Sequence, residues 1–137
     1  MKTKDILLYI WELPQNLVGL LLTCLLAPGQ KQPFRGARIL RTEKMNGGIS
    51  LGRYIIVSSL FSDSQTELHE WGHTLQSRLL GPLYLPVIGL PSLLWAIWWK
   101  PGKKRSYFSF YTERWADRLA GIRRFPSSDG RKTPPQP

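Results

Sequence analysis

The chain has 137 residues, a formal net charge of +10 and a single cysteine. This length allows one domain with a modest core, and one cysteine excludes an intrachain disulfide. The positive charge favours an anionic partner. No recognised nucleic-acid motif accompanies the charge, so a membrane surface is a better candidate than a specific nucleic acid.

Residues 6–27 form a mostly apolar stretch that follows Lys2 and Lys4. Glu12 and Asn16 interrupt it, and no small-residue cleavage site comes after it, so it makes a poor secretion signal. We therefore expect an apolar N-terminal helix or a membrane anchor.

Residues 37–41 and 48–57 carry many β-branched side chains, and a turn signal at residues 44–48 separates them. The pattern predicts a short β-hairpin, with its second strand nearer to the helix that follows. The hairpin could be one wall of the core or the edge that binds a substrate.

Residues 64–80 have the apolar periodicity of a helix. Asp63 or Ser64 can cap its start, and Gly81-Pro82 ends it. This helix would carry the only two histidines of the chain, His69 and His73.

The two histidines lie four residues apart, so both imidazoles can reach one metal ion from the same helix face. Glu70 follows the first histidine and is rotated by about 100° from it, which lets it touch a water on that metal without being a ligand. The His-Glu-x-x-His pattern is typical of zinc-dependent hydrolysis.

Residues 79–99 contain no formal charge and end in several tryptophans, followed by a basic cluster at residues 100–105. Aromatic side chains beside basic ones are typical of a membrane interface, and the length alone would allow a span. We expect an apolar helical insertion here.

A catalytic zinc site needs a third protein ligand. No other histidine exists and Cys24 lies in an apolar stretch, so the ligand should be a carboxylate. The acidic residues after the motif are Glu113, Asp117 and Asp129, and Asp129 lies in a polar tail. The first two belong to a predicted helix from about Thr112 to Gly121, although they could instead form a solvated face with neighbouring arginines. Small residues on the carboxylate face would let this helix approach the histidine helix closely.

Residues 113–117 (Glu-Arg-Trp-Ala-Asp) resemble the Glu-x-x-(Ser or Ala)-Asp element of the gluzincins, the thermolysin-like zinc peptidases. The resemblance implies that Glu113 is the third zinc ligand and that Asp117 holds the far ring nitrogen of His69. It covers the two helices, about a third of the chain, and Thr112 stands where the family often has asparagine. The implied fold is a minimal zincin-like α+β domain.

The expected activity follows from these residues. Glu70 would be the general base for a water on one zinc ion, and the substrate would be a peptide or protein. Tyr107, Tyr111 and Arg114 are candidate donors to the oxyanion. Peptidases of this type commonly bind substrate as a strand added to a sheet edge.

The proposed ligands also constrain the apolar segments. The two histidines precede residues 79–99 and Glu113 follows them, so this segment should return to the side it left, either as a re-entrant or interfacial hairpin or as a helix pair packed on the domain. We expect a single domain at residues 1–122 and a disordered basic, Pro-rich tail at residues 123–137.

The favoured interpretation is a membrane-associated zinc metallopeptidase, with a variant that hydrolyses some other amide. The alternative is a basic, non-enzymatic membrane adaptor with a structural helix pair, and a cytoplasmic location stays open. Glu70 favours the enzyme, because a structural zinc site normally has four protein ligands and no use for a base beside an open position.

Overall fold

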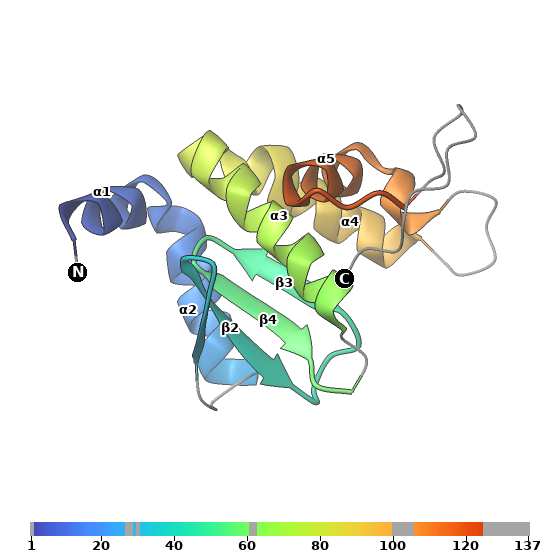
Figure 1. Ribbon diagram of the computed structural model, residues 1–137, viewed down its shortest axis with the longest axis horizontal. Coiled ribbons are helices and arrows are strands. Elements are labelled where there is room, and N and C mark those ends of the chain that lie inside the picture. Colours follow the sequence, from blue (N-terminus) through green and yellow to red (C-terminus); the bar gives the residue numbers. More distant parts are fainter. Residues whose placement is uncertain (1, 27–28, 30, 61–62, 100–105, 125–137) are drawn as a thin grey trace.

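A four-stranded mixed sheet lies between helices α2 (Leu13–Leu26) and α3 (Ser64–Leu80) (Figure 1). The computed structural model describes residues 2–26, 29, 31–60, 63–99 and 106–124. Helices and a small sheet together confirm the α+β fold class predicted from the sequence.

The sheet has the strand order β1-β2-β4-β3. Strand β1 (Gln32–Phe34) pairs antiparallel with β2 (Ala37–Thr42), β2 pairs parallel with β4 (Tyr54–Ser58), and β3 (Gly48–Leu51) pairs antiparallel with β4. Every residue of β4 is buried. A strand of this kind belongs in the centre of a sheet, and β3 is left at an edge.

The predicted hairpin between residues 37–41 and 48–57 is wrong, because residues 48–57 form two strands. The chain turns at Gly52, which has a φ of 62°, a conformation that glycine adopts without steric cost. The Asn16 side chain holds this turn by accepting a hydrogen bond of 2.8 Å from the backbone N–H of Arg53. The hairpin is therefore β3–β4, and β4 lies between β2 and β3.

Alternate side chains of the strands define the two helical layers. Ile39 and Ile55 point to the α3 side, where Trp71 packs against them. Leu40 and Ile56 point to the opposite face, where Leu22 of α2 covers them. Helix α3 is thus fixed across one face of the sheet by burial of apolar side chains.

The N-terminal apolar stretch forms two helices, α1 (Thr3–Trp11) and α2, which meet at Glu12 with a bend of 88°. No helix within the described residues is by itself long and apolar enough to cross a membrane; the bent α1–α2 pair meets the length and composition criteria only when taken together.

The segment after α3 is helical and leads the chain back along the domain. It consists of a 3₁₀ turn η1 (Gly81–Leu83), a π-helical turn η2 (Leu85–Gly89) and helix α4 (Leu90–Trp98). After a short 3₁₀ turn η3 (Tyr107–Ser109), helix α5 (Tyr111–Ala120) packs beside α3 (Figure 1). The basic cluster at residues 100–105 and residues 125–137 of the predicted tail lie outside the described residues.

Candidate metal centre

Helix α3 carries the two histidines, and the predicted helix at residues 64–80 is confirmed in both its bounds. Its N-cap is Asp63, whose carboxylate accepts a hydrogen bond of 2.8 Å from the Thr66 N–H. The chain leaves the helix at Gly81, where φ is 55°. A well-capped helix fixes the direction in which His69 and His73 project.

Helix α5 presents its carboxylates to α3. Glu113, Ala116 and Asp117 are all buried, which excludes the alternative of a solvated ion-pair face. The helix ends at Gly121, which adopts the left-handed conformation with φ of 75°. The two helices touch at Gly72, where any Cβ would overlap the backbone carbonyl group of Ala116. This close approach brings the carboxylates within reach of the imidazoles.

Three side chains from the two helices converge on one point. The Nε2 atoms of His69 and His73 lie 2.8 Å and 3.0 Å from the same oxygen, Oε2 of Glu113. One ligand atom from each of these residues lies within 4.8 Å of the others, and all three residues are buried. These are the residues expected from the sequence motif and from the gluzincin resemblance.

The far nitrogen of each imidazole is held by a second side chain. His69 Nδ1 lies 2.7 Å from Oδ1 of Asp117, as the resemblance implied, and His73 Nδ1 lies 2.7 Å from Oε1 of Gln76. The amide of Gln76 is oriented by its Nε2, which donates to the backbone oxygen of Thr112 at 2.8 Å. A carboxylate and an amide oxygen can only accept, so each Nδ1 donates. Each Nε2 is then directed at Oε2 of Glu113, as an N–H donor when the ring is protonated or as a lone pair when a metal ion lies between them.

Sequence reasoning missed Gln76 and two further neighbours of the site. The spacing of three residues from His73 could have indicated Gln76, since side chains three apart share a helix face. The Phe108 ring lies 5.2 Å from the His69 ring. Arg124, at the start of the segment predicted to be a disordered tail, donates to Asp117 Oδ2 at 2.7 Å and stacks on Phe108. No local signal in the sequence connects these two residues to the site.

Glu70 lies beside the three converging groups. Its side chain is buried, and its Oε2 atom has no hydrogen-bond partner among the described residues. Gly48 makes room for it, because a Cβ at that position would lie 2.6 Å from Oε1 of Glu70. Burial raises the pKa of Glu70, although the nearby imidazoles oppose the shift. A buried acceptor without a partner points to a group that the protein side chains do not supply.

The electrostatics of the cluster favour a positive charge between its three groups. Burial lowers the pKa of His69, but the hydrogen bonds with Asp117 and Glu113 outweigh burial and raise it to about 9. Burial would raise the pKa of Glu113, yet His73 and His69 hold it well below its usual range. Two imidazole lone pairs and a carboxylate oxygen cannot converge without a proton or a metal ion between them.

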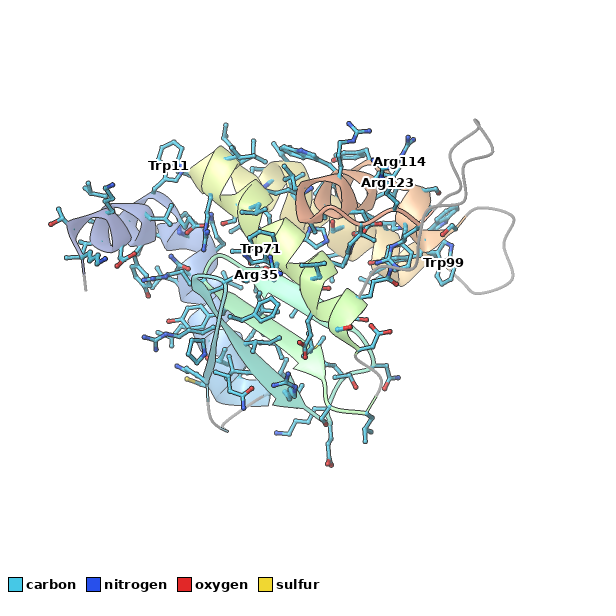
Figure 2. All side chains as sticks on the ribbon, viewed as in Figure 1. Trp11, Arg35, Trp71, Trp99, Arg114 and Arg123 are labelled. Atoms are coloured by element: carbon cyan, nitrogen blue, oxygen red, sulfur yellow. The ribbon has the colours of Figure 1, made fainter. Side chains whose placement is uncertain are left out.

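The three candidate oxyanion donors lie in different places. Burial and the negative charges of Glu113 and Glu70 raise the pKa of Tyr107, so its phenol lies within electrostatic reach of the site. The Tyr111 hydroxyl instead donates to the Val87 backbone oxygen at 2.8 Å. Arg114 is exposed on the outer side of α5 (Figure 2). The electrostatics therefore favour Tyr107 among the three candidates, while the Tyr111 and Arg114 side chains are directed elsewhere.

The residues present fit a metal ion. Two imidazole nitrogens and one carboxylate oxygen are a ligand set that zinc accepts in catalytic sites, where a fourth position stays open. The Asp117 carboxylate and the Gln76 amide hold the two imidazole rings so that their Nε2 atoms are directed at the metal position. The orphaned Oε2 of Glu70 is an acceptor for whatever occupies the open position.

Comparison with known proteins returned no match: no family model, no curated protein and no solved structure matches this chain. The chemistry of the site must therefore be inferred from its own geometry.

Proposed function

We propose that this chain is a zinc-dependent metallopeptidase. His69, His73 and Glu113 would hold one zinc ion, and Glu70 would be the general base. The observation that carries the proposal is the convergence of three ligand atoms within 4.8 Å beside a buried carboxylate with an unpartnered oxygen. Zinc-dependent hydrolysis uses this combination, since a general base must accept a proton next to the open metal position.

Each residue has a defined task. When bound, zinc would supply an activated water and polarise the scissile carbonyl group. Glu70 accepts a proton at its free carboxylate oxygen and passes it to the leaving amine. Tyr107 is the candidate donor to the developing oxyanion.

An extended peptide substrate would bind along the sheet edge formed by β3, beside the site. The Ser58 N–H donates to the backbone oxygen of Gly47, which directly precedes β3 and faces β4. The Ser50 backbone oxygen instead accepts from the Tyr84 hydroxyl at 2.8 Å, on the side away from β4. Gly48 is two residues from Ser50, so its N–H and C=O groups also point away from β4. They lie beside Glu70 and could pair with a substrate strand.

The alternative, a non-enzymatic membrane adaptor, would use the helix pair only as a structural element. A structural zinc site normally has four protein ligands. The described part of the chain provides three side chains around the site and a carboxylate beside them, and the exposed Cys24 lies on α2. This arrangement favours hydrolysis over a structural metal.

The proposal is tested by zinc content and peptide cleavage measured on the same preparations. We expect about one zinc ion per chain, lost in His73→Ala and Glu113→Ala. Glu70→Gln should keep the zinc and lower the cleavage rate of a peptide library by a factor of about 10²–10⁴. Glu67→Gln is the matched control, because Glu67 lies on the same helix and pairs with Arg41 at the surface.

Two outcomes would contradict the proposal. If the parent chain holds no zinc even after reconstitution, the three residues do not form a zinc site. Zinc retained at full occupancy without cleavage of any library peptide would favour a structural role for the helix pair.

A further inference from the structure

Helix α2 has the reverse of the polarity expected for a helix on a water-soluble domain. Its buried residues are Gln15, Asn16, Gly19 and Thr23. Its large apolar side chains are exposed instead: Leu13, Leu17, Val18, Leu21 and Leu25. A helix that packs on a domain in water normally buries its apolar stripe. The surroundings of α2 must therefore include something apolar besides the sheet.

Hydrogen bonds hold the bend between α1 and α2, at residues 11–16, against the end of α3. The Gln15 Nε2 donates to Ser77 Oγ and to the Gly81 backbone oxygen, both at 2.9 Å. Ser77 Oγ in turn donates to Oε1 of Glu12 at 2.5 Å. The indole of Trp11 donates to the Arg78 backbone oxygen at the end of α3, where Figure 2 shows it. Hydrogen bonds therefore fix the bend between the two helices, and the apolar side chains of α1 and α2 remain exposed on the other side.

Helix α4 shows the same exposure. None of its residues is buried, and no charged residue occurs between Leu79 and Trp99. Apart from Leu60 and Tyr111, every large hydrophobic side chain that is exposed in the described part of the chain lies in residues 6–25 or 79–98. Such a concentration is far from the scattered exposure that is normal for a soluble surface.

The segments that carry these exposed side chains meet at one buried cluster. Leu22 of α2 and Leu85 of η2 pack on the same buried cluster, formed by Leu51, Tyr84 and Ile88. Helix α2 also contacts η1, and η1 leads through η2 to α4 (Figure 1). We call the exposed apolar side chains of α1, α2, η1, η2 and α4 the apolar face.

We propose that the apolar face binds the surface of an anionic lipid bilayer. A protein partner would be expected to meet some charged or polar side chains, yet no charged residue occurs in residues 13–26 or 79–99. Trp11 and Trp98 are exposed on this face, and exposed Lys2 and Lys4 precede it, as at a membrane interface. The net charge of +10 favours anionic headgroups.

The helices of the face would lie along one leaflet. α1, α2 and α4 have 9, 14 and 9 residues, whereas a crossing helix needs about 20. The bend of 88° at Glu12 also prevents α1 and α2 from acting as one straight span. Binding by an apolar face of this kind grows with the apolar area inserted and with the attraction of anionic lipid.

The test is flotation of the full chain with vesicles of phosphatidylcholine alone or mixed with phosphatidylserine. We expect tighter binding to the mixed vesicles. The double variant Leu21→Glu with Leu94→Glu should weaken binding by about tenfold or more, because it introduces charge into the face. Leu60→Glu is the matched control: its side chain is 62% exposed, against 59% for Leu21 and 57% for Leu94, and it lies outside the face.

The proposal is overturned if neither vesicle binds the chain, or if the double variant binds as well as the parent. It is also overturned if the chain forms a dimer in solution that the double variant abolishes while vesicle binding is absent, since a second copy would then cover the face. Glu70→Gln and the zinc-free chain should float like the parent, so failure of the peptidase proposal would leave this result unchanged.

Discussion

Gly72 of α3 packs directly against the backbone carbonyl group of Ala116 on α5, with no space for a Cβ between them. Gly72→Ala must therefore push the helices apart, and we expect the free energy of unfolding to fall by about 1–3 kcal/mol. Because Glu113 and His69 lie on the two helices, zinc affinity should fall as well. Urea denaturation and zinc titration measure the two effects.

The control for this variant is Gly47→Ala. A Cβ at Gly47 would meet no atom within 4 Å, so stability and zinc affinity should both stay close to those of the parent. If Gly72→Ala behaves like Gly47→Ala, the helices do not pack as closely as the structure indicates.

Gln76→Leu should weaken zinc binding by about 10–100-fold. The substitution removes the oxygen that lies 2.7 Å from His73 Nδ1. The imidazole is then no longer held in the tautomer that has its proton on Nδ1 and its Nε2 lone pair available to the metal. Competition with a zinc chelator gives the affinity. Gln32→Leu, on the exposed strand β1 where its side chain accepts from Arg41, should leave it unchanged. Equal affinities in the two variants would mean that Gln76 only fills space.

Tyr107→Phe should lower kcat of the proposed peptidase by about 10²–10³-fold while zinc content stays at the parental value. The loss should appear in kcat more than in KM, because an oxyanion donor acts mainly in the transition state. Tyr111→Phe is the control, since that hydroxyl donates to Val87. A Tyr107→Phe variant with parental kcat would remove this residue from the chemistry.

Glu12 should make the stability of the fold depend on pH. Burial raises its pKa above 4.5, so the folded chain binds this proton more tightly than the unfolded chain. Its contribution is fully present below pH 4.5 and is lost as the pH rises through the folded-state value. Glu12→Gln can still accept from Ser77 and should remove this part of the decline.

The measurement is the thermal midpoint of the parent and of Glu12→Gln between pH 4 and about 9. As the pH rises through this range, the Glu12 carboxyl group ionises in the unfolded chain before it does so in the folded chain. The two profiles should meet at low pH and separate as the pH rises, with the variant more stable at the alkaline end. Parallel profiles would show that Glu12 is solvated in the folded protein.

The sequence was sufficient for the parts of the site that depend on local spacing. The helix at residues 64–80 and the helix ending at Gly121 follow from caps and periodicity, and the spacing of four places His69 above His73. Only the resemblance assigned Glu113 and Asp117 their roles, because no local pattern distinguishes a ligand from its neighbour.

The failures have tertiary causes. The predicted hairpin was wrong because the chain turns at Gly52, and the Asn16 side chain that holds this turn comes from a helix far away in the sequence. Gln76 was missed because its amide acquires a direction only from the Thr112 backbone oxygen on α5. The inverted polarity of α2 also could not be read from periodicity, since its burial is decided by Ser77 and Gly81.

The separation of His69 from Glu113 by 44 residues has a consequence for folding kinetics. Closing so long a loop costs conformational entropy, so we expect the three ligands to meet late, after the chain has returned along α4 and docked α5. Bonds from all three ligands to a zinc ion would then contribute little to the folding transition state. We therefore expect bound zinc to slow unfolding much more than it speeds folding. The ion would then give the protein kinetic stability: it would raise the barrier to unfolding and leave the folding rate nearly unchanged.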